Sequence, residues 1–286
     1  GYMTEKNTRI LSLGAGVQST CVALMSVHGE IEPVEHAIFS DTGWEPKSVY
    51  KHLEWLTPIM EEAGIQVHKV KARPRTDKMT GDIRQDALSD DVSASMPIFL
   101  KDHETGSMGT AHRQCTSEYK IIPVQAKERE IIGLAKSSRW RPENGYITNV
   151  MGISLDEIQR MKDNRLKYID NEFPLIDLRM TRNDCMQWMK RNGYPEPPRS
   201  ACIGCPYHSN FEWRHMKLND PESFADAVDF DYKLREQSKR NVGNKYRNIP
   251  YLHRSGVPLD QVDLRNEEDM GQINLFNQEC EGMCGI

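Results

Sequence analysis

The sequence has no long hydrophobic run. The mean hydropathy of its 286 residues is −0.67, and nothing approaches the roughly 18 consecutive apolar residues that a membrane-spanning helix needs. Residues 1–9, GYMTEKNTR, are polar and lack the apolar core of a secretory signal. We therefore expect a cytoplasmic protein with no membrane partner.

A surplus of basic charge is also missing. The chain has 37 Lys and Arg against 42 Asp and Glu, a net charge of −5. This balance excludes a basic surface over the whole protein, although a local patch for nucleic acid stays open. The seven cysteines are an odd number, and in a cytosolic chain they favour metal or redox chemistry over a disulfide framework.

The common phosphate-binding motifs are absent too: neither GxxxxGKS/T nor GxGxxG occurs. Residues 12–20, SLGAGVQST, instead place two glycines between a short apolar run and a helix-like stretch. Free backbone N–H groups in such a turn, together with the helix dipole, can hold phosphate. By itself this stretch also fits a purely structural turn.

The first half alternates as a parallel α/β fold requires. Expected strands lie at 9–13, 36–40, 65–70 and 146–153, and expected helices at 19–28, 46–63 and 118–135. We expect helices on both faces of a parallel sheet, interrupted by a polar, mobile loop or insert at 73–112 that is a usual place for function.

The second half is less regular. It predicts a short strand at 174–178, a helix capped by Thr181 that stops at Gly193, and two or three short helices within 209–241. We expect three parts: an α/β core (1–180), a helical region with a cysteine-bearing loop (181–250), and an irregular segment with a cysteine-containing tail (251–286).

Three cysteines are candidate metal ligands. Cys202 and Cys205 form a CxxC loop in SACIGCPYH, and Cys115 lies at the edge of the 73–112 insert. Three thiolates suit either a zinc site completed by His208 or His112, or an iron–sulfur cluster. The spacing does not choose between these two kinds of site.

The other four cysteines divide into two pairs. Cys21 and Cys185 lie on apolar faces of expected helices, where packing is the expected role. Cys280 and Cys284 lie in the tail ECEGMCGI, where they can be metal ligands, redox thiols or inert.

Four segments together resemble the phosphoadenosine phosphosulfate (PAPS) reductase family, within the adenine-nucleotide α-hydrolase-like superfamily that includes the PP-loop ATP pyrophosphatases. They are GAGVQS at 14–19, IFSDTGWEPKSVY at 38–50, MGISLDEIQRMKDNR at 151–165 and PLIDLRMTRNDCMQWMKRNGYP at 174–195. Gln18 replaces the acidic residue of the superfamily loop, as in the reductase branch, and Ser154 stands where arginine is often seen.

The resemblance implies a HUP/PP-loop-type core that binds an adenine nucleotide, with Mg²⁺ as a further candidate ion. The residues it implies for nucleotide binding are Gly14, Ala15, Gly16, Val17, Gln18, Ser19, Asp41, Thr42, Gly43, Gly152, Arg113 and Arg165. Arg160 is a candidate catalytic cation for the sulfonate and the leaving nucleotide. Each of the arginines also fits a merely solvated charge.

The resemblance also bears on the cysteines. Iron–sulfur members of the family carry a CC pair followed by KxxP and a later CxxC; here Cys115 matches the first of the pair, Thr116 replaces the second, and Lys120 and Pro123 follow. Cys115, Cys202 and Cys205 would then hold a 4Fe–4S cluster with one iron lacking a cysteine.

Two enzyme classes and one binding class follow. In the first, a tail thiolate, Cys280 or Cys284, attacks adenylylated sulfate and a thiol reductant releases sulfite. In the second, ATP activates tRNA or DNA, pyrophosphate leaves, and cluster-bound sulfide or a persulfide displaces AMP, with a sulfur donor protein as a candidate partner. The third is a non-catalytic nucleotide-binding protein with structural zinc.

Overall fold

The structure is a computed structural model that describes residues 6–74, 76–92, 96–111, 117–240 and 246–265. Its centre is a sheet of five parallel strands in the order β3-β2-β1-β6-β7. The strands are β1 (Asn7–Ser12), β2 (His36–Asp41), β3 (Gln66–Lys71), β6 (Tyr146–Met151) and β7 (Ile169–Glu172). The expected α/β class with a parallel sheet is confirmed. The strand order reverses between β1 and β6, the point where ligands bind in open α/β sheets.

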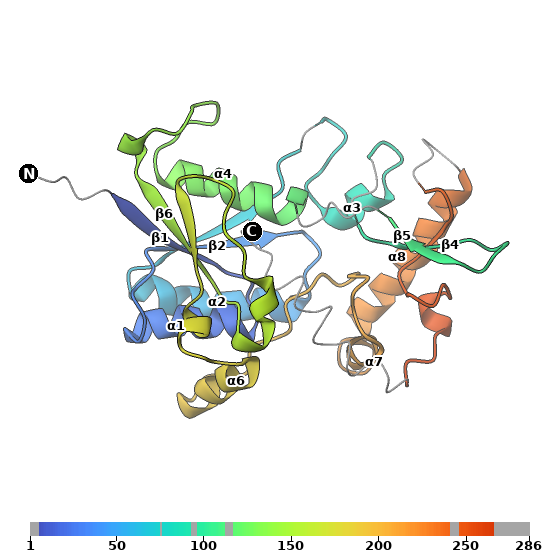
Figure 1. Cartoon of the computed structure of the whole chain (residues 1–286). Coiled ribbons are helices and arrows are strands. Elements are labelled where there is room, and N and C mark those ends of the chain that lie inside the picture. The colour runs from blue at the N-terminus through green and yellow to red at the C-terminus, as the bar shows by residue number, and fades with distance from the viewer. Residues whose placement is uncertain (1–5, 75, 93–95, 112–116, 241–245, 266–286) are drawn as a thin grey trace, which may run out of the picture.

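Helices cover both faces of this sheet (Figure 1). They are α1 (Val17–His28), α2 (Lys47–Glu62), α5 (Pro174–Asp177) and α6 (Arg182–Arg191) on one face, and α4 (Ile122–Ile131) on the other. Side chains alternate along a strand, so Leu11 packs towards α1 while its neighbour Ile10 packs with Val124 of α4. Cys21 of α1 and Cys185 of α6 are fully buried in the first of these cores, which confirms their expected packing role.

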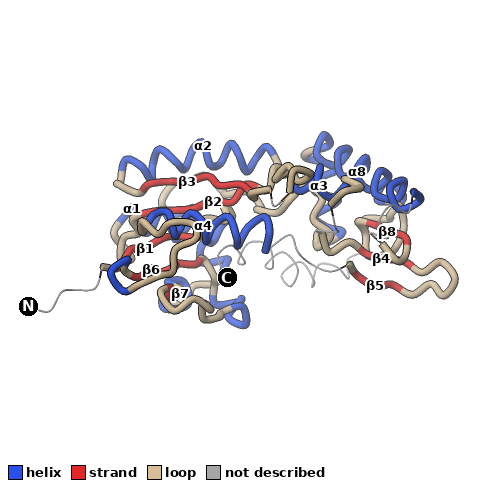
Figure 2. The backbone as a smooth tube through the Cα atoms, turned by 90° about the horizontal axis from the view of Figure 1, so that it is seen from above, coloured by secondary structure: helices blue, strands red, loops and turns tan. Residues whose placement is uncertain are grey.

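A second, smaller body lies beside the sheet (Figure 2). It contains the antiparallel sheet β5-β4-β8, with β4 (Phe99–Lys101), β5 (Met108–Thr110) and β8 (Ile249–Tyr251), and the helices α3 (Ile83–Leu88), α7 (Asn210–Asn219) and α8 (Pro221–Arg240). The buried carboxylate of Asp231 on α8 binds Arg235 at 2.6 Å and accepts the backbone N–H groups of Leu252 and Leu259. This carboxylate fixes the segment after β8 to α8.

Short helical turns complete the described elements: η1 (Ser117–Ile121), η2 (Pro142–Asn144), η3 (Leu155–Arg160) and η5 (Leu259–Gln261). In α6 the expected cap is confirmed, because Thr181 Oγ1 accepts the N–H of Asp184 at 3.1 Å. None of the helices in the described ranges has the length and apolar character to cross a membrane.

Three expectations differ from the structure. Residues 73–112 are not one irregular loop, because they contain α3, β4 and β5, and β4 pairs with β8 far along the chain. Residues 174–178 form helix α5 rather than a strand, and the edge strand β7 precedes them. The region 209–241 holds one short helix and α8, which runs for 20 residues. Three- and four-residue strands are too short to show a period, and their partners are distant in sequence.

A buried imidazole between α1 and α2 makes the stability of the core depend on pH. His52 Nε2 lies 2.8 Å from Thr20 Oγ1, and burial lowers the pKa of His52 from 6.5 to about 4. Between these values the unfolded chain binds a proton that the folded chain does not, so stability is complete above pH 6.5 and falls as the pH drops towards 4. We expect this group to remove about 2 kcal/mol of unfolding free energy between about pH 7.5 and pH 5.

Urea unfolding at the two pH values measures this loss. His52→Gln should flatten the pH dependence, whereas His103→Gln, at an exposed imidazole, should leave it as in the wild type. An unchanged pH slope in His52→Gln would contradict the assignment.

Candidate functional site

The turn between β1 and α1 is a buried, internally braced loop. Gly14 N–H donates to Ser19 Oγ at 3.1 Å, and the Gly14 carbonyl accepts a hydrogen bond from Ser200 Oγ. Ala15 has a φ of 61°, in the left-handed region. Gly16 is the N-cap of α1 and supplies no capping side chain, so the first turn of α1 keeps the N–H groups and positive dipole end that attract anions.

A chain of three buried polar side chains joins this turn to η3. Gln18 Nε2 donates to Glu157 Oε1 at 3.1 Å, and Arg160 Nη1 lies 3.3 Å from Glu157 Oε2. Gln18 and Glu157 are 2% and 1% exposed. η3 follows β6 and α1 follows β1, so the chain bridges the two strands at which the order of the sheet reverses.

The same place holds polar atoms without partners. Within the described residues, Gln18 Oε1, Ser154 Oγ and Arg160 Nη2 are buried and make no hydrogen bond. Buried polar groups normally have hydrogen-bond partners, so these atoms call for an explanation, and a bound water, ion or ligand is one. A donor from Arg160 and a hydroxyl from Ser154 fit an anionic oxygen.

Gly152 has a packing role at this edge. A Cβ at this position would lie 2.8 Å from Ser19 N and 2.9 Å from Ser19 Cα. Only glycine lets the end of β6 approach the first turn of α1 so closely. Gly152 therefore packs directly against the backbone of Gln18 and Ser19, in the first turn of α1.

The loop after β2 is ordered by its own carboxylate. Asp41 Oδ1 accepts the Gly43 N–H and the Tyr50 hydroxyl, each at 2.8 Å. Burial and this hydrogen bond raise the pKa of Tyr50 above its ordinary value. Gly43 has a φ of 82°, and a Cβ there would meet Asp82 Oδ2 at 2.8 Å. Asp41, Thr42 and Gly43 thus form a tight turn at the carboxyl end of β2.

The CxxC loop sits directly on this turn. Ile203 N–H donates to the Trp44 carbonyl at 2.9 Å, and a Cβ on Gly204 would lie only 2.0 Å from the Trp44 ring. Thr42 Oγ1 is hydrogen-bonded to Cys202 Sγ at 3.1 Å. Both thiols of the loop are buried, 6% exposed at Cys202 and at Cys205. The cysteine loop therefore abuts the turn expected to bind nucleotide.

His208 is engaged by protein groups on both ring nitrogens. Nε2 lies 2.9 Å from the Cys202 carbonyl, and Nδ1 lies 3.1 Å from Glu212 Oε2. Among the described residues, no group of three or more His, Cys, Asp or Glu side chains could hold a metal ion. The zinc alternative also includes Cys115 and His112, which lie outside the described ranges, so it stays a prediction.

Several predicted site residues fall outside the described ranges: His112, Arg113, Cys115, Thr116, Cys280 and Cys284. The proposed third thiolate and the tail thiols therefore remain predictions. Arg165 is described and is exposed, in the connection from β6 to β7.

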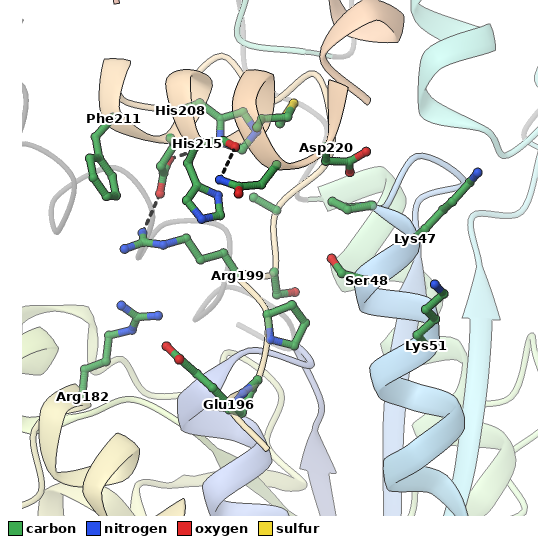
Figure 3. Close-up of a pocket in the computed structure, with 18 of the residues that line it drawn as sticks. Lys47, Ser48, Lys51, Arg182, Glu196, Arg199, His208, Phe211, His215 and Asp220 are labelled. Atoms are coloured by element: carbon green, nitrogen blue, oxygen red, sulfur yellow. Dashed lines mark hydrogen bonds and ion pairs between the residues drawn. The ribbon is translucent and has the colours of Figure 1, made fainter. Parts of the chain in front are cut away.

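A groove that the motifs did not indicate lies next to the CxxC loop (Figure 3). It has a volume of about 800 Å³ and runs between the start of α2, the segment 196–201 and α7. We call it the α7 groove. Its basic lining residues are Lys47, Lys51, Arg182 and Arg199, and two histidines, His208 and His215, also line it. In the sequence, the feature that could have indicated this groove is the pair Lys47 and Lys51, which are four residues apart and therefore lie on one face of a helix.

Comparisons with known proteins add no assignment: no protein-family model matches the chain, and no curated protein matches it either.

The contact between Gly204 and the Trp44 ring predicts a specific mutational effect. In Gly204→Ala the new methyl group would overlap the ring, so the loop must shift, and we expect a loss of about 1–3 kcal/mol in unfolding free energy. We also expect faster alkylation of Cys202 and Cys205 by a thiol reagent in the metal-free protein.

Gly109→Ala is the matched control, because its Cβ would meet no atom within 4 Å. Thermal unfolding and peptide mapping of the alkylated cysteines measure both effects. Equal alkylation rates in Gly204→Ala and Gly109→Ala would show that Trp44 does not seat the loop.

Proposed function

We propose that the chain binds an adenine nucleotide at the carboxyl edge of β1, β2 and β6 and uses it in activated-sulfur chemistry, as a PAPS-reductase-like enzyme. The observation that carries this proposal is the chain Gln18–Glu157–Arg160, whose buried atoms Gln18 Oε1 and Arg160 Nη2 have no partner among the described residues. A HUP/PP-loop-type core is part of the proposal.

Each residue of this edge has a chemical task. The uncapped N-terminus of α1 binds phosphate oxygens through its N–H groups. Glu157 holds Arg160 through Nη1, and Nη2 is left for an oxygen of the phosphate or sulfonate. A fixed cation in a dry site stabilises charge that develops on a leaving nucleotide. Gln18 aligns Glu157 without adding a second negative charge near the phosphates.

The cysteine loop fits an iron–sulfur cluster in the chemistry of its donors. Cys202 and Cys205 are two buried thiols on one tight loop, and Thr42 Oγ1 is hydrogen-bonded to the Cys202 sulfur at 3.1 Å. With Cys115 as the predicted third ligand, they would hold a 4Fe–4S cluster. Such a cluster would supply inorganic sulfide and one iron without a cysteine ligand.

The reaction proceeds by two thiol attacks. A tail thiolate, Cys280 or Cys284, attacks the sulfur of adenylylated sulfate, forming an S–S bond and breaking the S–O bond to the nucleotide phosphate. A second thiol, from an external dithiol reductant, then attacks the cysteine sulfur. A disulfide forms and sulfite leaves with the electron pair.

A second candidate is an ATP-dependent sulfurtransferase that releases pyrophosphate and acts on tRNA or DNA. The α7 groove is the observation that favours it, because its cations lie beside the cysteine loop.

Arg160 provides the test of the nucleotide site. Arg160→Gln removes the unpartnered guanidinium N–H, and we expect it to weaken binding of sulfonucleotide or ATP by about tenfold or more, since a charged hydrogen bond is worth roughly 1.5–3 kcal/mol. Isothermal titration with APS, PAPS and ATP measures the loss. Arg139→Gln, at an exposed arginine before β6, is the matched control.

Equal affinities in Arg160→Gln and Arg139→Gln would overturn the nucleotide site. The products separate the two enzyme classes: sulfite released from APS or PAPS supports the reductase, and pyrophosphate released from ATP supports the sulfurtransferase.

The cluster has its own test. Anaerobically purified wild type should contain iron and acid-labile sulfide, and Cys202→Ser should lose most of both, because a hydroxyl is a poor ligand for these metals. Cys21→Ala, at a cysteine buried in α1, should retain them. Zinc without sulfide in the wild type would instead support the non-catalytic protein.

A further inference from the structure

The α7 groove has the length and lining of a strand-binding site. Its lining follows α7 from Phe211 to Asn219, a rise of about 12 Å. The start of α2 lines one end, and the start of α6 lines the other. In Figure 3, Lys47, Ser48 and Lys51 lie on one side of the segment 196–201, and Arg182 and Phe211 lie on the other.

Two of the four carboxylates that line the groove, Glu157 and Glu212, are paired with basic side chains. Glu157 binds Arg160, and Glu212 binds Arg199 at 2.6 Å and His208 at 3.1 Å. Asp220 accepts the hydroxyl of Ser223 at 2.6 Å and keeps its negative charge. Glu196 is the remaining acidic lining residue and is exposed.

Three basic side chains of the groove, Lys47, Lys51 and Arg182, are available to a ligand. Lys51 and Arg182 make no ion pair with any described side chain. Lys47 pairs with Glu222 at 2.8 Å, but both side chains are more than 70% exposed, and such surface pairs contribute little. α2, which starts at Lys47, has no side-chain cap, so its positive end adds to the lysines.

Two aromatic rings lie on the same face of α7. Phe211 and His215 are one helical turn apart, with ring centroids 6.4 Å apart, and Arg214 lies 5.7 Å from the Phe211 ring centroid. Both rings line the groove. Aromatic side chains between cations are the arrangement that binds single-stranded nucleic acid, because bases stack on the rings while phosphates meet the charges.

We propose that the α7 groove binds single-stranded nucleic acid, with one phosphate at Lys47 and Lys51, another at Arg182, and a base on Phe211 and His215. This goes beyond the proposed nucleotide chemistry and stands without it. The chain as a whole carries a charge of −5, so the interaction depends on this local group of cations rather than on a general field.

Fluorescence anisotropy with labelled single-stranded DNA and RNA of about 12 nucleotides tests the proposal. We expect binding at low salt by the full-length wild-type protein. Lys51→Gln combined with Arg182→Gln should weaken it at least about tenfold and reduce the salt slope by about 1.4, since two phosphate contacts are lost. Phe211→Ala should weaken binding about tenfold at an unchanged salt slope.

Lys190→Gln combined with Arg191→Gln, at exposed residues at the far end of α6, removes the same charge outside the groove and should bind as the wild type does. Thermal unfolding confirms that each variant is folded. Three results would each overturn the proposal. The first is no strand binding, and the second is equal affinity in the groove and control variants. The third is displacement of the strand by AMP alone, because the groove would then be a mononucleotide site.

The assay contains no sulfonucleotide, and titration of the same samples with APS, PAPS and ATP reports the β1–α1 site separately. Loss of nucleotide binding with strand binding intact would count against the proposed function alone. The reverse result would count against the groove alone.

Discussion

The contact between the Trp44 ring and the CxxC loop is the constraint on which the arrangement of the two bodies depends. Trp44 follows β2 of the parallel sheet, yet its ring packs 4.7 Å from that of Phe230 on α8, and its Nε1–H donates to Asp226 at 2.6 Å. Gly204 fits over the ring because it has no side chain. One buried indole thus fixes the smaller body, the cysteine loop and the end of β2 against one another.

The buried polar chain at β1 and β6 places a second constraint on the same edge. Gln18, Glu157 and Arg160 lie in a region where an unpaired charge would be costly. Glu157 binds one nitrogen of Gln18 and one nitrogen of Arg160. It leaves Gln18 Oε1 and Arg160 Nη2 without a hydrogen-bond partner among the described residues. An isolated Arg160 would take many rotamers, whereas one held through Nη1 directs the rest of its guanidinium to a single place.

The carboxyl edge of β1 and β6 and the α7 groove meet at two residues. Glu157 belongs to the polar chain and also lines the groove, and Ser200 lines the groove while its hydroxyl donates to the Gly14 carbonyl. The segment 196–201 therefore separates two polar regions and contacts both. A ligand in the groove would lie beside the cysteine loop.

The local pattern of residues was sufficient for the central sheet and its helices. Buried strands and amphipathic helices have periods that can be recognised within ten or twenty residues, and Thr181 and Asp184 form a cap within four. The turn at 14–16 and the CxxC loop could be recognised for the same reason. The edge strand β7, the helix α5 and the pairing of β4 with β8 could not, because each is too short to carry a period and depends on distant neighbours. The same distinction holds for the site. The residue types suggested Gln18, Arg160 and Cys202. Only the tertiary structure decided that Arg160 keeps an N–H group without a partner, that Gly152 packs against α1, and that Trp44 packs against the cysteine loop. Those properties are distances between residues far apart along the chain, and only the packing of the folded chain sets such distances.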